Sequence, residues 1–93
     1  MKAVIFYEST DKDMNKIMAV FPRHKKLLDA YHASGALLAV GTWANPMEGS
    51  MGVFADRASA ERFVKEDPFI QEGLVGKVTI RDWNEMLMGN KPG

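Results

Sequence analysis

Two residues of this sequence, His24 and Asp67, could together handle a proton. Each falls on the apolar face of a predicted helix, where a titrating side chain is least expected. His24 shares its face of the helical wheel with Val20 and Leu28, and Asp67 continues the apolar spacing of the helix before it. Pro68 must end that helix, so the Asp67 carboxylate would meet the unfavourable negative end of the helix dipole. Because an interior acid and an interior base both need partners, we expect the two side chains to contact each other.

A His–Asp pair of this kind can exchange protons at neutral pH. Histidine titrates near neutrality, and a carboxylate bonded to one ring nitrogen fixes the tautomer and leaves the other nitrogen free for substrate. No motif supplies a serine or cysteine nucleophile. The pair therefore favours cofactor-free isomerisation, tautomerisation or elimination on a small polarised molecule, with His24 as general acid and base and Asp67 orienting it.

The same residues also have a purely structural interpretation. A histidine on an apolar face is more often a satisfied core residue than a catalyst. Asp67 could merely cap the turn that begins at Pro68. The spacing alone leaves this alternative open.

Five further residues are candidates for substrate binding: Tyr7, Arg23, Trp43, Ser50 and Phe69. Trp43 and Phe69 could wall an aromatic pocket, although core packing is the more ordinary use of such rings. The phenol of Tyr7 and the hydroxyl of Ser50 stand at strand ends, from which they could reach a ligand. Arg23 directly precedes the candidate histidine.

The composition excludes several classes of function. The chain has no cysteine, which excludes disulfides, zinc ribbons and thiol chemistry. Twelve basic and twelve acidic residues give zero net charge, which argues against binding to nucleic acid or to anionic lipid. His24 and His32 lie roughly 80° apart on the helical wheel, a poor geometry for one ion, so we expect no metal site.

The sequence also predicts where the protein resides. No stretch approaches the ~18 apolar residues that a membrane span needs. The first apolar run reaches Glu8 too soon for a signal peptide. We therefore expect a cytoplasmic protein with no membrane partner.

Apolar runs and turn residues predict a single α+β domain over residues 1–88, with a loose tail at 89–93. Short apolar runs predict four strands, at residues 3–7, 36–43, 50–55 and 77–83. Helical spacing predicts two helices, at residues 12–34 and 56–66, the first with cap chemistry at 9–11.

Prolines and glycines refine this prediction. Pro22 either kinks the first helix or divides it in two. The Asp67–Phe69 segment breaks the second helix, and Gly73 and Gly76 bracket a turn. The order of elements is βαββαβ, which is a ferredoxin-like sandwich.

Two of the predicted strands, at 3–7 and 36–40, are apolar on both faces. Such strands are buried on both sides, yet two helices can cover only one face of a four-stranded sheet. We expect a second copy of the chain to cover the other face, which gives a homodimer packed sheet to sheet. The alternative is that some of these side chains are simply exposed.

Several segments resemble the YciI-like (YCII-related) family. They are Arg-His-Lys-Lys-Leu-Leu at 23–28, Gly-Ala-Leu-Leu-Ala-Val-Gly at 35–41, and Glu-Asp-Pro-Phe at 66–69. The resemblance covers nearly the whole chain. It implies a dimeric α/β barrel made from two ferredoxin-like subunits, each with a cleft that contains a His–Asp dyad, here His24 and Asp67. Family members of known role include dehydrochlorinases, which are lyases that remove HCl from chlorinated hydroxyquinols.

The chain departs from the family pattern at two positions. Phe21 stands where members often carry an arginine three residues before the histidine, and Thr42 stands where they often carry a proline. The first departure weakens any claim that this helix binds an anion. The resemblance does not carry a substrate over to this chain.

Three other functions remain open on the sequence. The dimer could hold a small ligand without turning it over. It could be a haem- or oxygen-dependent monooxygenase, since similar dimeric barrels host both. It could be a structural protein in which the dyad only ties two helices together.

Overall fold

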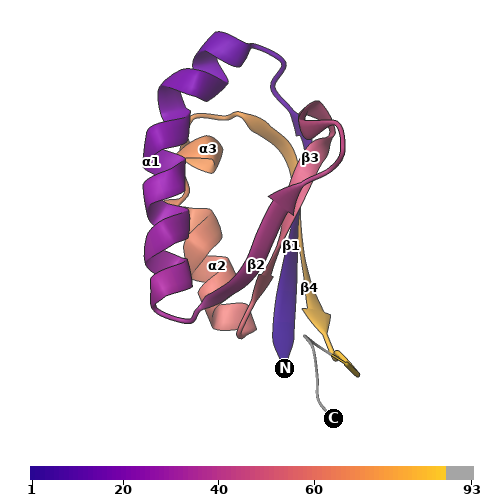
Figure 1. Cartoon of the computed structure of the whole chain (residues 1–93). Helices are drawn as coiled ribbons and strands as arrows, with labels where there is room; N and C mark the ends of the chain where they lie inside the picture. Colours follow the sequence, from indigo (N-terminus) through magenta and orange to yellow (C-terminus); the bar gives the residue numbers. More distant parts are fainter. Residues whose placement is uncertain (88–93) are drawn as a thin grey trace.

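Four antiparallel strands form one sheet, and the α-helices all lie on one of its faces (Figure 1). The computed structural model describes residues 1–87. The strands are β1 (Lys2–Thr10), β2 (Leu37–Thr42), β3 (Gly49–Phe54) and β4 (Val75–Trp83). The helices are α1 (Met14–Ala33), the short 3-10 helix η1 (Pro46–Glu48), α2 (Arg57–Glu66) and α3 (Pro68–Gln71). The predicted βαββαβ order and the ferredoxin-like fold are confirmed, and the predicted tail at 89–93 lies outside the described residues.

The strand order β2-β3-β1-β4 places β1 inside the sheet, where both of its edges are paired. Alternate residues of β1 point toward the helices, and Ala3, Ile5 and Tyr7 are 0%, 3% and 4% exposed. They pack with Leu37 and Phe54 in the core cluster under the helices. This register brings the end of β1 that carries Tyr7 beneath α1 and α3.

The edge strand β2 is more open than the sequence predicts. Leu37 is buried, but the rest of the strand is exposed, and Val40 is 49% exposed in the single chain. Within the single chain, residues 36–40 are therefore not buried on both faces, because an edge strand has a neighbour on one side only; the predicted burial depends on a second copy. The prediction holds for Val4 of β1, which is 6% exposed.

The helix α1 runs without interruption through Pro22, so the division into two helices does not occur. Its first turns are inclined to the rest of the helix (Figure 1), as is common where a proline removes a backbone hydrogen bond. The N-cap is Asp13, whose carboxylate accepts from the N–H groups of Asn15 and Lys16. The cap predicted at 9–11 is displaced because β1 extends to Thr10.

The chain between α2 and β4 differs from the predicted break and turn. Residues 68–71 form the short helix α3, which ends before Gly73 at a φ of 72°. Gly76 belongs to β4, because that strand begins at Val75, which pairs with Thr10. The backbone N–H of Asp11 also donates to the carbonyl of Leu74 at 2.8 Å, so this loop is tied to the start of α1.

Candidate functional site

Asp67 lies at the junction between α2 and α3 and is 0% exposed. Its φ of −70° and ψ of 120° are the extended conformation favoured before proline, which ends α2 at this residue. Its Oδ1 accepts from the backbone N–H of Phe69 at 3.0 Å and so caps α3. The predicted conflict with the α2 dipole is therefore offset, because the carboxylate also meets the N–H end of the next helix.

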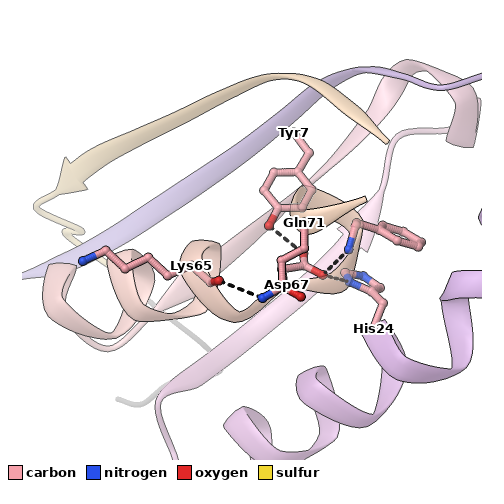
Figure 2. Close-up of polar contacts among 6 residues, drawn as sticks. Tyr7, His24, Lys65, Asp67 and Gln71 are labelled. Carbon is pink, nitrogen blue, oxygen red and sulfur yellow. Dashed lines mark hydrogen bonds and ion pairs between the residues drawn. The ribbon is translucent and has the colours of Figure 1, made fainter. Parts of the chain in front are cut away.

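The side chains of His24 and Tyr7 also bind this carboxylate (Figure 2). His24 Nδ1 lies 2.7 Å from Oδ1, and the Tyr7 hydroxyl donates to Oδ2 at 2.6 Å. The pair predicted to meet is thus within hydrogen-bond distance, 43 residues apart in the chain. With the Phe69 N–H, the carboxylate has three partners, which offset the cost of burying its charge.

The junction itself is braced from both sides. The Gln71 side-chain amide donates to the carbonyl of Lys65 at 3.1 Å, which spans the break between α2 and α3 (Figure 2). The backbone N–H of Asp67 donates to the carbonyl of Phe63 at 2.9 Å. These bonds hold the carboxylate in place against rotation of one helix relative to the other.

The ring of His24 lies between aromatic side chains. Phe69 stacks on it with 4.0 Å between ring centroids and 5° between planes, and Phe63 presents an edge at 6.3 Å. The side chain of His24 is 12% exposed. An ionised carboxylate only accepts hydrogen bonds, so Nδ1 donates to Asp67 and Nε2 is the ring nitrogen left for a ligand.

Tyr7 serves the site through Asp67. Burial, the negative charge of Asp67 and the hydrogen bond to it, in that order, raise the pKa of the phenol far above its ordinary value. The hydroxyl therefore stays protonated and keeps donating to Oδ2. Tyr7, predicted from the sequence as a substrate-binding residue, lines the cleft and donates its hydroxyl hydrogen bond to Asp67.

A cleft of about 350 Å³ opens between α1 and the strands β2 and β3, and it is lined by His24, Tyr7, Ser50 and Phe69 among others. Its deep end, a space of about 30 Å³, is also lined by His24, Tyr7 and Ser50 and reaches Gly52. The larger volume is within the range of small-molecule sites. Four of the predicted site residues other than Asp67 thus share one cleft.

Two predicted site residues lie elsewhere. Trp43 stacks on Phe6 at 6.4 Å, because strand alternation after Thr42 turns residue 43 to the sheet face away from the helices. Arg23 precedes His24 on α1, so its side chain points about 100° away from that of His24 around the helix axis. It is exposed, and its guanidinium lies 3.9 Å from the carboxylate of Glu72. Neither Trp43 nor Arg23 lines the cleft.

Sequence analysis missed two glycines that shape the site. A Cβ on Gly49 would lie 1.9 Å from the carbonyl oxygen of Tyr7, and the φ of Gly49 is 122°. Gly52 is opposite Ile5 on the helix-facing side, where the lack of a side chain leaves the deep end of the cleft open. The sequence carries only a weak signal for these roles. Gly49 looks like an ordinary turn glycine, and Gly52 is marked only as a glycine inside a predicted strand.

Within residues 1–87, no three His, Asp or Glu side chains gather closely enough to hold a metal ion. In the same part of the chain, no helix has the length and apolar character needed to cross a membrane.

Comparison with known proteins gives a family model and several solved structures. The model of the YCII-related domain matches residues 1–84. Comparison with curated protein sequences finds no match. One similar structure is 5-chloro-2-hydroxyhydroquinone dehydrochlorinase (TftG) from Burkholderia phenoliruptrix AC1100, in complex with 2,5-dihydroxybenzoquinone. It has a TM-score of 0.71 and 19% identity, over 90% of this chain and 94% of that one.

Two further structures are similar over almost their whole lengths. One is a proposed antibiotic biosynthesis monooxygenase from Bacteriodes thetaiotaomicron VPI-5482, with a TM-score of 0.59, 13% identity, and coverage of 99% of this chain and 95% of that one. The other is an antibiotic biosynthesis monooxygenase, with a TM-score of 0.54, 17% identity, and coverage of 99% and 100%. At these identities the likeness shows a shared fold.

Proposed function

This chain belongs to the YCII-related domain family, and we propose that it is an enzyme that transfers protons on a small molecule held beside His24. The observation that carries the proposal is the hydrogen bond of 2.7 Å between His24 Nδ1 and the buried carboxylate of Asp67. The imidazole ring that makes this bond also lines the cleft. The carboxylate fixes the tautomer and stabilises the imidazolium, so Nε2 can accept or return a proton.

The reaction we favour is an elimination. Nε2 of His24 takes a proton from a hydroxyl or carbon of the substrate, the released electron pair forms a double bond, and the leaving group departs with its own electron pair. The fold shared with a dehydrochlorinase supports HCl loss as the first reaction to try. Isomerisation uses the same proton transfer, with the proton returned at another atom.

The test is a panel of chlorinated hydroxyquinols and small ketones in D₂O, followed by proton NMR and by chloride release. We expect turnover or solvent deuterium exchange of at least one compound, slowed by about 10²–10⁴-fold in His24→Gln. His32→Gln is the matched control, since it changes the other histidine of the chain, which is exposed. A compound that binds in the cleft and is recovered unchanged with both histidines present favours the alternative, a non-catalytic binding protein.

We also propose that the chain acts as a homodimer through the sheet face away from the helices. Figure 1 shows that the α-helices leave this face uncovered. A hollow of about 430 Å³ on it is lined by Val4, Phe6, Met51 and Trp83, and Trp83 is 38% exposed. Burying such side chains against a second copy is favourable.

Light scattering tests this assembly. Phe6→Glu should convert a dimer into a monomer, whereas Met18→Glu, at a 65% exposed position on α1, should not. A monomeric wild-type chain would refute the proposal. A cytoplasmic location stays a prediction of the sequence analysis.

A further inference from the structure

The cleft beside His24 has strongly apolar walls. Met14 and Phe21 line it from α1, and Met47 lines it from η1, the connection between β2 and β3. Met14 and Phe21 are 50% and 43% exposed, so both leave apolar surface uncovered at the mouth of the cleft. These side chains would be covered by an apolar ligand.

The cleft has little to offer an anion. Among the described residues that line it, Lys25 is the one with a permanent charge. Its Nζ is already bonded to both oxygens of Asp29, at 2.7 and 2.9 Å. The buried carboxylate of Asp67 adds negative charge behind His24. A carboxylate or phosphate on a ligand would therefore meet a lysine already paired with Asp29 and the like charge of Asp67.

Three hydroxyl side chains form a row across the sheet at the end of the cleft near His24. The register pairs Tyr7 of β1 with Ser50 of β3, and Ser50 with Thr42 of β2, and all three line the cleft. The Tyr7 proton is committed to Asp67, so its oxygen can only accept, while Ser50 and Thr42 can donate or accept. This hydroxyl row suits a neutral hydroxyl or carbonyl group.

We infer that the cleft binds an uncharged, largely apolar molecule that carries one hydroxyl or carbonyl group. The polar group lies at the hydroxyl row beside His24, and the apolar remainder lies between Met14 and Met47. This inference rests on the proposed function for its choice of cleft, and it narrows the substrate class from small molecules in general to neutral hydrophobic ones.

The experiment compares two probes that differ in charge, 2-naphthol and 2-naphthoate. Binding is followed by NMR of methionine methyl groups labelled with carbon-13. We expect 2-naphthol to bind at least tenfold more tightly and to shift the signals of Met14 and Met47, which line the cleft. The signal of Met18, which is 65% exposed and lies outside the cleft lining, is the internal control.

A matched variant tests the hydroxyl row. Ser50→Ala should weaken binding of 2-naphthol several-fold and leave binding of naphthalene unchanged, because only the former has a hydroxyl to pair. Equal or tighter binding of 2-naphthoate overturns the inference, as does failure of 2-naphthol to shift Met14 and Met47. If Lys25→Ala then removes 2-naphthoate binding, the cleft is an anion site.

The same titrations in His24→Gln separate this inference from the proposed function. The variant cannot transfer protons through residue 24, yet its apolar walls and hydroxyl row are intact. Selective binding of 2-naphthol by both proteins, with no turnover of any panel compound by the wild type, would support the ligand class and refute the enzyme. Turnover of a panel compound by the wild type, together with preferred binding of 2-naphthoate, would support the enzyme and refute the ligand class.

Discussion

The Tyr7–Asp67 hydrogen bond should stabilise the fold more than an equally short bond elsewhere in the chain. Tyr7→Phe removes one donor from a carboxylate that is 0% exposed and leaves the ring in place. A hydrogen bond to a charged group contributes about 1.5–3 kcal/mol, and the carboxylate keeps only its bonds to His24 and the Phe69 N–H. We therefore expect the free energy of unfolding to fall by about 2 kcal/mol.

Tyr31→Phe is the matched control. Its hydroxyl donates to Glu66 Oε1 at 2.7 Å, close to the 2.6 Å of the Tyr7 bond, but Glu66 is exposed and water can replace the phenol. We expect a loss of about 0.5–1 kcal/mol. Urea denaturation of the two variants and the wild type measures both values. Equal losses would refute the argument that burial of the Asp67 charge makes its donors important.

The remaining predictions concern pH and the two glycines of the site. The raised pKa of Tyr7 keeps its phenol protonated in the folded chain, so stability is fully present below pH ~10 and falls by about 1.4 kcal/mol per pH unit above it. Between pH 10 and 11, urea denaturation should show a loss of stability smaller by about 1 kcal/mol in Tyr7→Phe, because the unfolded phenol is only partly ionised there, and an unchanged slope would contradict the shift. Gly49→Ala should destabilise the fold by more than ~3 kcal/mol, because strain at positive φ adds to the overlap with the Tyr7 carbonyl. Gly35→Ala, at a φ of 85° with no atom within 4 Å, should show the strain alone, about 1 kcal/mol, and equal thermal shifts would refute the overlap. Gly52→Ala meets Phe54 at 3.3 Å and should change stability by less than ~1.5 kcal/mol, yet it should weaken 2-naphthol binding in a calorimetric titration; unchanged affinity would show that the deep end is unused.

Much of the fold could be predicted from local patterns. The apolar face of α1 and the strand runs are repeated over many residues, so an error at one position does not change the assignment. The boundaries were less certain, because they depend on single tertiary contacts. β4 begins at Val75 rather than at residue 77 because Val75 pairs with Thr10 across the sheet, and no local signal encodes that pairing.

Site residues could be predicted where a polar side chain interrupts an apolar face. They could not be predicted where their role depends on contacts with residues distant in the sequence. Asp67 and His24 were found because each interrupts an apolar face. The role of Tyr7 depends on a carboxylate 60 residues away, and only the assembled sheet and helices bring the two together. The position of Trp43 away from the cleft could not be predicted, because the choice of sheet face after the end of β2 depends on the register between β2 and β3.

The structural and catalytic interpretations of Asp67 do not exclude each other. Its Oδ1 both caps α3 and binds His24, so the bond that ends one helix also fixes the ring that faces the cleft. A carboxylate kept only for the cap would need neither His24 nor an open space beside it. The ring instead lines a cleft whose apolar walls are left uncovered by the rest of the chain, and within residues 1–87 its Nε2 has no hydrogen-bond partner. A structural histidine in the core would be expected to have both nitrogens hydrogen-bonded, and this asymmetry between the two nitrogens is what favours a ligand at Nε2.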